Sequence, residues 1–254
     1  MALLAIFTTL PALAQTDTNA PMPTSAPALK PVVVTSTRTE AAPFDVPASI
    51  DVVGGDAMRD GRLQINLSES LGGVPGLMVQ NRQNYAQDLQ LSIRGFGARS
   101  SFGIRGVRLY VDGIPATMPD GQGQSSNIDI GSAERVEILR GPFSALYGNS
   151  SGGVIQVFTE TGEGPPTVSG SFAIGSYGLR RYGLKVGGST RASDGGAGFD
   201  YLLSTSRFTT DGWRDHSRTS RDNVNIRLGV TLADDARLTL LLNSVRLDAQ
   251  DPLG

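Results

Sequence analysis

The chain has 254 residues, no cysteine, one histidine and a formal net charge of −2. Without cysteine there are no disulfides, no thiolate chemistry and no cysteine-based zinc sites, and His216 alone leaves little for histidine-based catalysis or metal binding. The nearly neutral charge gives no reason to expect nucleic acid as a partner. The 32 glycines and 14 prolines indicate many turns and short strands.

Residues 1–14 are uncharged and end in Ala12-Leu13-Ala14, which is the small-x-small pattern of a cleavage site. The stretch is shorter than the roughly 20 residues that a membrane-spanning helix needs, so we interpret it as a signal peptide. The alternative is a buried N-terminal helix. Residues 15–30 are rich in Pro, Ala, Thr and Ser and are expected to form a disordered linker, too short to hold a further folded domain.

A β-branched run follows the linker and consists of Pro31, Val32, Val33, Val34, Thr35 and Ser36. Adjacent valines favour an extended backbone. Such a strand can pair with the sheet edge of another protein, or it can be the first strand of the chain's own sheet. The residues alone leave both alternatives open.

The pattern over residues 37–162 predicts an α+β domain with many glycine-rich loops. Short helices are expected near Asp56 and after Asn66 or Ser68, with these side chains as N-caps. The expected strands are short and are bounded by turn residues. They are Ser49–Val53, Leu77–Val79, Leu91–Ile93, Val107–Val111, Glu134–Arg140 and Gly152–Phe158.

Residues 163–254 have a different pattern, with five strands of roughly ten residues in which apolar and polar side chains alternate. The clearest strand places Val224, Ile226 and Leu228 on one face and Asn225 and Arg227 on the other. Such strands are typical of transmembrane β-barrels, with the apolar side toward lipid. A soluble sandwich or lipocalin-type barrel, with the apolar face inward, is the alternative.

The links between these strands favour the membrane interpretation. Short links at Arg191–Ala197 and Ala233–Ala236 alternate with a longer polar loop at Thr209–Asp222, as expected for periplasmic turns and outer loops. No stretch of 18 continuous apolar residues follows the signal peptide, so membrane insertion would use strands. Five strands leave two open edges that cannot be satisfied in hydrocarbon, so we expect the sequence to be a truncated part of a larger barrel.

Several motifs resemble, in order, the plug domain of TonB-dependent outer-membrane receptors. The resemblance is carried by LSIRGFG at Leu91–Gly97, LYVDGIP at Leu109–Pro115, and ERVEILRGPFSALYG at Glu134–Gly148, which is followed by GGVIQVFT at Gly152–Thr159. It implies an α+β plug followed by the first strands of a barrel, in the outer membrane. It also identifies Pro31–Ser36 as the TonB box, which pairs with TonB and its ExbB/ExbD complex, and it implies transport without a signalling domain.

The resemblance further implies roles for plug side chains. Arg94 and Arg140 match plug arginines that pair with glutamates on the inner barrel wall, and those glutamates would lie beyond Gly254; ordinary surface arginines are the alternative. Outward loops at Asn81–Asp88, Gly97–Gly103 and Ala116–Gln124 would contact the ligand. The candidate contact residues are Asn84, Tyr85, Arg99, Phe102, Met118, Asp120 and Gln122.

The expected cargo is a ferric siderophore, with pyrroloquinoline quinone as a second candidate because Ile114–Gln124 resembles the branch that includes its receptors. No catalytic motif, resident cofactor or protein-bound metal is expected. The remaining alternatives are a binding-only surface protein, such as an adhesin or a phage or toxin receptor, and a non-functional fragment.

Overall fold

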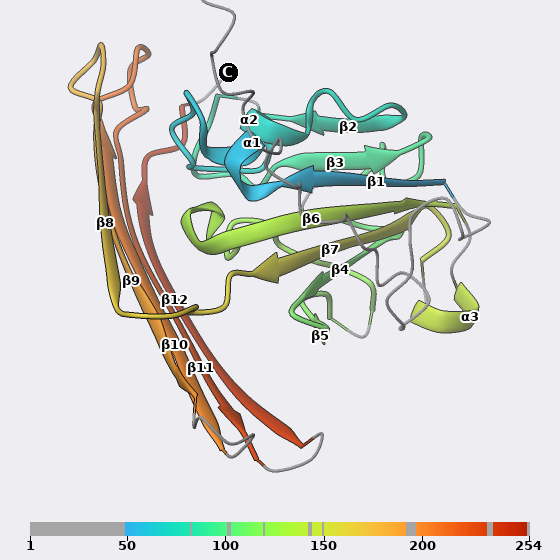
Figure 1. Cartoon of the computed structure of the whole chain (residues 1–254). Helices are drawn as coiled ribbons and strands as arrows, with labels where there is room; N and C mark the ends of the chain where they lie inside the picture. The colour runs from blue at the N-terminus through green and yellow to red at the C-terminus, as the bar shows by residue number, and fades with distance from the viewer. Residues whose placement is uncertain are drawn as a thin grey trace, which may run out of the picture. The chain divides into compact units, whose positions relative to one another are not determined.

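A computed structural model describes residues 49–81, 83–100, 103–118, 120–141, 144–148, 150–191, 197–232 and 236–252 (Figure 1). The predicted signal peptide, linker and TonB box therefore lie outside the described residues. The described chain forms an N-terminal α+β domain and a C-terminal sheet of long strands.

The α+β domain is built on a mixed sheet with the strand order β1-β6-β7-β4-β5, in which β4 and β7 are parallel and all other neighbours are antiparallel. The strands β2 and β3 form a separate antiparallel pair. The elements are β1 Ser49–Gly54, α1 Gly55–Arg59, α2 Ser68–Leu71, β2 Leu77–Gln80, β3 Gln90–Ile93, β4 Val107–Val111, β5 Ile114–Pro115, η2 Ile130–Ser132, β6 Ala133–Arg140, α3 Ser144–Tyr147 and β7 Gly153–Thr159.

The hydrophobic core of this domain lies between the mixed sheet, the helices and the β2–β3 pair. Met58 of α1, Leu71 of α2, Leu91 of β3, Ile138 of β6 and Ile155 of β7 are all completely buried in it. The strand positions predicted from the sequence agree with the observed strands to within two residues at each end. Their short apolar runs were sufficient for this prediction because each strand is bounded by turn residues.

The predicted helix caps are wrong. The helix α1 begins at Gly55 without a side-chain cap, and Asp56 lies in its first turn, where the carboxylate pairs with Arg59 at 3.0 Å. The helix α2 also lacks a side-chain cap at its N-cap residue, Leu67.

Glu69 takes over the role of a cap for the chain that leads into α2. Its carboxylate accepts hydrogen bonds from the backbone N–H groups of Gln64 and Ile65, both at 2.8 Å, and of Asn66 at 3.1 Å. A carboxylate that accepts several backbone hydrogen bonds holds a loop strongly because these bonds are charge-assisted. Sequence reasoning missed this arrangement, because Glu69 comes three to five positions after the amides that it binds.

The C-terminal sheet consists of β8 Thr167–Ile174, β9 Arg180–Arg191, β10 Gly198–Thr210, β11 Thr219–Thr231 and β12 Arg237–Ala249. Its strands pair antiparallel in chain order, so β8 and β12 each have one strand neighbour within the described residues. The ladder of β10 and β11 extends to Thr210 and Thr219, which shortens the link between them to residues 211–218. The predicted loop, Thr209–Asp222, was therefore too long.

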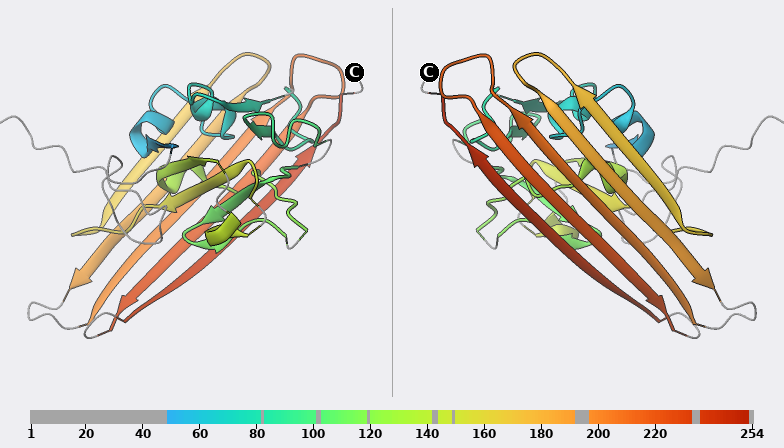
Figure 2. Two further views of the ribbon diagram at one scale, coloured as in Figure 1. Left: turned by 90° about the vertical axis from the view of Figure 1, so that its right-hand side faces the viewer. Right: turned by 90° about the vertical axis from the view of Figure 1, so that its left-hand side faces the viewer.

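The two faces of this sheet differ in polarity. Large apolar side chains on one face are exposed, among them Val168, Phe172, Ile174, Leu184, Phe199, Leu238, Leu240 and Leu242. Polar side chains on the other face are buried against the α+β domain, among them Asp200, Ser204, Asn223, Asn225 and Arg227. Figure 2 shows the domain on one face of the sheet only. The polar face is therefore the inner one, which is the orientation of a membrane barrel and the reverse of a soluble one.

The predicted fold class is thus confirmed: an α+β domain is followed by five antiparallel strands with a lipid-type outer face. Among the helices of the described ranges, none is long and apolar enough to cross a membrane.

Candidate functional site

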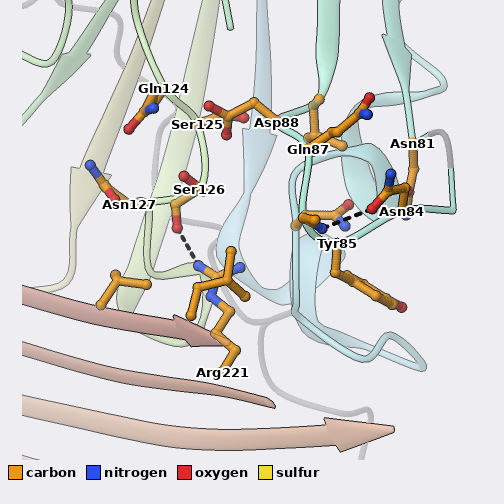
Figure 3. Close-up of a pocket in the computed structure, with 15 residues that line it drawn as sticks. Asn81, Asn84, Tyr85, Gln87, Asp88, Gln124, Ser125, Ser126, Asn127 and Arg221 are labelled. Carbon is orange, nitrogen blue, oxygen red and sulfur yellow. Dashed lines mark hydrogen bonds between the residues drawn. The ribbon is translucent and has the colours of Figure 1, made fainter. Parts of the chain in front are cut away.

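A pocket of about 280 Å³ lies between the α+β domain and one end of the strands β11 and β12 (Figure 3). On the side of the sheet it is lined by Arg221 of β11 and by Val245 and Leu247 of β12. Its walls consist mostly of side chains with amide, hydroxyl or carboxylate groups. The lining residues are Asn66, Asn81, Asn84, Tyr85, Ala86, Gln87, Asp88, Leu89, Gln124, Ser125, Ser126, Asn127, Arg221, Val245 and Leu247. This lining can hold a small polar molecule through hydrogen bonds, with Leu89, Val245 and Leu247 as apolar contacts.

The loop that connects β2 to β3 forms one wall of the pocket, and side chains of β10 and of the chain after β12 fasten it. Asn84 donates its side-chain amide to Asp251 at 2.6 Å, and its carbonyl oxygen accepts the backbone N–H of Ala86 at 2.9 Å. The ring of Tyr85 packs on Phe208, with the ring centroids 5.1 Å apart. Asn84 and Tyr85 therefore line the predicted site and also anchor it.

The link between β10 and β11 holds the same loop from another side. The indole N–H of Trp213 donates to the side-chain oxygen of Gln83 at 3.2 Å, and Arg214 donates to the backbone carbonyl of Gln83 at 3.3 Å. Gln83 has a positive φ of 53°, a conformation that costs energy for a residue with a side chain. The contacts from the link compensate for this cost and fix the shape of the loop.

Arg221 on β11 forms the floor of the pocket and joins two separate segments of the domain. Its guanidinium donates to the backbone carbonyl of Ile65 at 2.6 Å and to that of Ser126. A planar guanidinium suits this task because its donors have a fixed fork geometry. The carboxylates of Asp88 and Asp129 lie close enough to interact electrostatically with this cation.

Burial changes the acid–base properties of two groups in the pocket wall. Burial raises the pKa of Asp88, although hydrogen bonds from Ser126 and the charge of Arg221 oppose this shift. Burial also raises the pKa of Tyr85, and the carboxylate of Glu69 adds to the increase. Both shifts mean that burial makes a negative charge on either side chain less favourable than it is in water.

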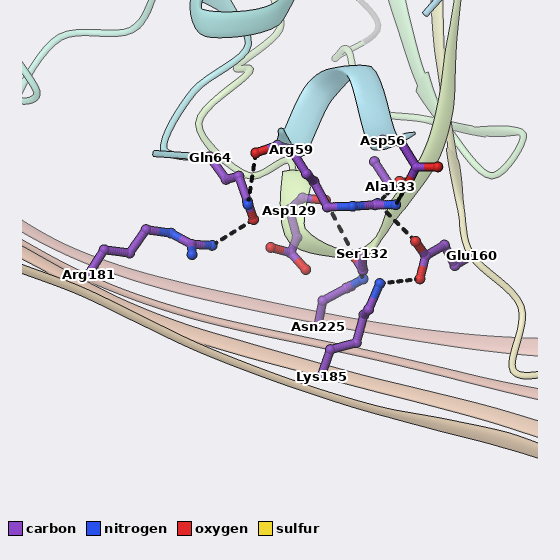
Figure 4. Close-up of polar contacts among 10 residues, drawn as sticks. All are labelled: Asp56, Arg59, Gln64, Asp129, Ser132, Ala133, Glu160, Arg181, Lys185 and Asn225. Carbon is purple, nitrogen blue, oxygen red and sulfur yellow. Dashed lines mark hydrogen bonds and ion pairs between the residues drawn. The ribbon is translucent and has the colours of Figure 1, made fainter. Parts of the chain in front are cut away.

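A second group of contacts fastens the domain to the inner face of β9 and β11. Asn223 donates to Asp129 at 3.0 Å, Asn225 donates to Ser132 at 2.9 Å, and Arg181 donates to Gln64 at 3.1 Å. Figure 4 shows the last two contacts below α1.

An ion-pair network is centred on Glu160, which directly follows β7. Glu160 accepts Lys185 of β9 at 2.5 Å and Arg59 of α1 at 2.8 Å (Figure 4). Arg59 also donates to the backbone carbonyl of Ala133 at 2.6 Å. The network therefore links the first helix, the chain after β7 and the sheet. All three charged side chains are partly buried, with 20–25% of each exposed.

The two predicted plug arginines have different surroundings. Arg140 pairs with Asp51 of the neighbouring strand β1 at 2.5 Å and donates to the backbone carbonyl of Pro75 at 2.7 Å. It therefore has a carboxylate partner inside its own domain, which the sequence did not reveal. Arg94 is exposed in the turn after β3 and has a positive φ of 49°. Their pairing with barrel glutamates stays a prediction.

The other candidate ligand contacts lie outside the pocket. Met118 is exposed at 65%, and its backbone N–H donates to the carbonyl of Gln122 at 2.7 Å. The carboxylate of Asp120 accepts the backbone N–H of Gln122 at 3.0 Å. These residues form a turn that is held by its own hydrogen bonds. Arg99 is exposed in another turn, and Phe102 lies outside the described residues.

Sequence reasoning missed the barrel side of the site. The missed residues are Arg221, Asn223 and Asn225, which all lie on the polar face of β11. The alternation of polar and apolar side chains along this strand is the signal that could have identified them as part of the site. Across the described ranges, no group of three or more His, Asp or Glu side chains is arranged to hold a metal ion.

The sequence of the chain is similar to a known family of proteins. Residues 42–154 match the family model of the TonB-dependent receptor plug domain. The chain is 32% identical over 133 residues to the vitamin B12 transporter BtuB of Vibrio vulnificus, a match that covers 52% of this chain and 21% of the transporter. It is 36% identical over 131 residues to the hemin receptor of Yersinia enterocolitica, covering 50% of this chain and 18% of the receptor.

The fold of the chain is also similar to that of a solved receptor structure. The ferric yersiniabactin uptake receptor FyuA from Yersinia pestis superposes with a TM-score of 0.58 at 26% identity, and the match covers 79% of this chain and 31% of that receptor. The chain spans about a fifth of the length of the two curated relatives.

Proposed function

Because the chain belongs to the TonB-dependent outer-membrane receptors, we propose that the receptor containing it takes up a scarce small molecule across the outer membrane. In this proposal the α+β domain is the plug of the barrel. The pocket between the plug and β11–β12 binds the ligand on the outer side. Opening of the plug then admits the ligand.

The observation that carries the proposal is the chemistry of the contact between plug and sheet. Apart from the packing of Tyr85 on Phe208, the contacts described above are hydrogen bonds and ion pairs between side chains of β9–β11 and the plug, and the two from Arg221 go to backbone carbonyls. The apolar core of the plug lies within the plug itself. When the plug separates from the sheet, water can replace these polar partners, so each contact opposes separation by only about 0.5–3 kcal/mol, whereas the surface of a dry apolar interface has no such replacement. Such a plug is fastened in place and can still move.

The energy source in this proposal is TonB, which would capture Pro31–Ser36 by pairing with its backbone. Support comes from the β-branched composition of this run and from its position ahead of the plug. Strand pairing of this kind depends on backbone hydrogen bonds, so extended propensity matters more than side-chain identity.

For the ligand, we propose the class formed by iron siderophores, heme and vitamin B12. The named relatives are a vitamin B12 transporter, a hemin receptor and a ferric yersiniabactin receptor. The polar pocket with Arg221 at its floor supports a ligand rich in oxygen acceptors. Pyrroloquinoline quinone fits the same chemistry and remains a candidate from the sequence of residues 114–124.

The test is uptake by cells that express the full-length receptor. Radio-iron-loaded yersiniabactin, hemin, cyanocobalamin and pyrroloquinoline quinone are offered in turn, with TonB present or deleted and with the proton gradient intact or collapsed. We expect one of these compounds to accumulate only when TonB and the gradient are both present. Binding without accumulation under every condition would instead identify a binding-only surface protein.

A further inference from the structure

Among the described residues that line the pocket of the candidate site, the charged side chains are Asp88 of the β2–β3 loop and Arg221 of β11. Tyr85 also lines this pocket, and burial raises the pKa of its hydroxyl group, so Tyr85 is neutral at physiological pH. Asp88 therefore supplies the negative charge of the wall, and Arg221 supplies the positive charge of the floor. Which of these two charges dominates decides the kind of ligand that the pocket favours.

Several hydrogen-bond donors of this pocket are used within the protein. The guanidinium of Arg221 donates to two backbone carbonyls of the plug. The side-chain amides of Asn84 and Gln87, which both line the pocket, donate to the carboxylate of Asp251 at 2.6 and 3.4 Å. A ligand in the pocket therefore meets donors that already have acceptors.

The pocket wall also contains two buried acceptors that have no hydrogen-bond partner within the described part of the chain. They are one carboxylate oxygen of Asp88 and the hydroxyl oxygen of Ser125. Hydrogen bonds from Ser126 and the charge of Arg221 act to lower the pKa of Asp88, but burial has the larger effect and raises this pKa. The negative charge of Asp88 is therefore not fully compensated inside the protein, and a positively charged donor would add the missing compensation.

Further carboxylates offset the positive charge of Arg221. Asp88, Asp129 and Glu69 all interact electrostatically with its guanidinium, and Arg181 is a second cation that interacts with Asp129 and Glu69. These three carboxylates and two guanidinium groups leave one negative charge in excess. An excess of negative charge beside a partly desolvated pocket attracts cations and disfavours anions.

We propose that this pocket selects small molecules that carry a protonated amine, with Asp88 as the specificity-determining residue. The inference rests on the proposed binding of the ligand in this pocket, and it adds a cationic donor to the oxygen-rich ligand class named above. In this arrangement the ammonium group lies on the side of the β2–β3 loop, and the oxygen atoms of the ligand lie on the side of Arg221. A ligand with a neutral or acidic group beside the loop lacks the attraction of Asp88.

The test measures the charge preference of the pocket without a transported ligand. Ala86 lines the pocket and is exposed, and the 254 residues contain no cysteine. The Ala86→Cys variant of the full-length receptor, with any cysteine outside these residues replaced by serine, therefore carries a single thiol at the pocket. The purified receptor is treated with cationic 2-aminoethyl methanethiosulfonate or with anionic 2-sulfonatoethyl methanethiosulfonate. Because both reagents react with the same thiolate, the ratio of their rate constants, divided by the ratio for a free thiol, measures the charge preference.

Three variants in the Ala86→Cys background isolate the contribution of Asp88. Asp88→Asn removes the charge and keeps the shape of the side chain, whereas Asp88→Glu keeps the charge. Asp60→Asn is the matched control, because it removes an exposed carboxylate from the plug at the end of α1.

We expect the thiol at position 86 to prefer the cationic reagent about tenfold, and Asp88→Asn to remove most of this preference. Asp88→Glu and Asp60→Asn should both retain it. The absence of a cationic preference in the Ala86→Cys receptor, or a preference that Asp88→Asn leaves unchanged, would overturn the proposal. The labelling requires neither TonB nor uptake, so a receptor that accumulates none of the offered compounds contradicts the transport function alone.

Discussion

Removal of the Arg221 guanidinium is expected to loosen two plug segments at once. Arg221→Met deletes the hydrogen bonds to the carbonyls of Ile65 and Ser126 and leaves the nearby carboxylate of Asp88 without its cation. A hydrogen bond with a charged partner contributes about 1.5–3 kcal/mol, so the lower bound for two bonds is about 3 kcal/mol. This free energy corresponds to a roughly hundredfold increase in local opening.

Hydrogen exchange in the full-length receptor measures this opening directly. The informative amides are those of Gln64, Ile65 and Asn66, which are bonded to Glu69 beside the Arg221 contact. Arg207→Met is the matched control, because Arg207 is an arginine of the same sheet that is exposed at 63% and pairs loosely with an exposed carboxylate. Equal changes in the exchange of these amides in Arg221→Met and Arg207→Met would show that the Arg221 contacts do not hold these plug segments.

Three further predictions concern the plug and its attachment. Glu69→Ala removes the acceptor of three backbone amides and should lower the local stability of the loop before α2 by at least about 4.5 kcal/mol on the same basis, measured by exchange at those amides. A double-mutant cycle between Lys185→Met and Glu160→Gln should give a coupling of about 1 kcal/mol in thermal unfolding of the receptor, and additive effects would argue against the ion pair. Because burial raises the pKa of Asp88, its charged form destabilises the folded loop at neutral pH. Asp88→Asn should therefore slow hydrogen exchange in residues 86–90 at neutral pH, relative to the unmodified protein. This difference between the two proteins should disappear once the pH falls below the ordinary pKa of aspartate. A difference that grows as the pH is lowered would contradict the prediction.

The fold could be predicted from the sequence because its signals are local. Alternation along β11 depends on neighbouring residues only, and it correctly assigned Asn225 and Arg227 to the inner face. The Asp112-Gly113 turn was equally readable, and both residues have the positive φ that such a turn requires. The predicted cap at Asp56 failed because the helix begins at Gly55, so that Gly54 is the N-cap residue and Asp56 lies inside the first turn.

The candidate site was less predictable because its contacts join residues far apart in the chain. Asn84 meets Asp251, and Arg221 meets Ile65 and Ser126, across more than 90 positions in every case. Nothing in a local pattern specifies such partners. Sequence reasoning therefore named two residues that line the pocket, Asn84 and Tyr85, whose role in ligand binding stays a prediction, and it missed the sheet that gives their loop its shape.

In the proposed mechanism TonB energises the receptor through Pro31–Ser36, and a single substitution can separate this coupling from ligand binding. Val33→Pro in the full-length receptor removes a backbone donor and disrupts strand pairing, whereas Ala28→Pro adds a proline to a linker that already contains several. We predict that Val33→Pro abolishes uptake of the accepted compound while its binding at the cell surface stays normal, and that Ala28→Pro changes neither. Unimpaired uptake by the Val33→Pro receptor would contradict the account.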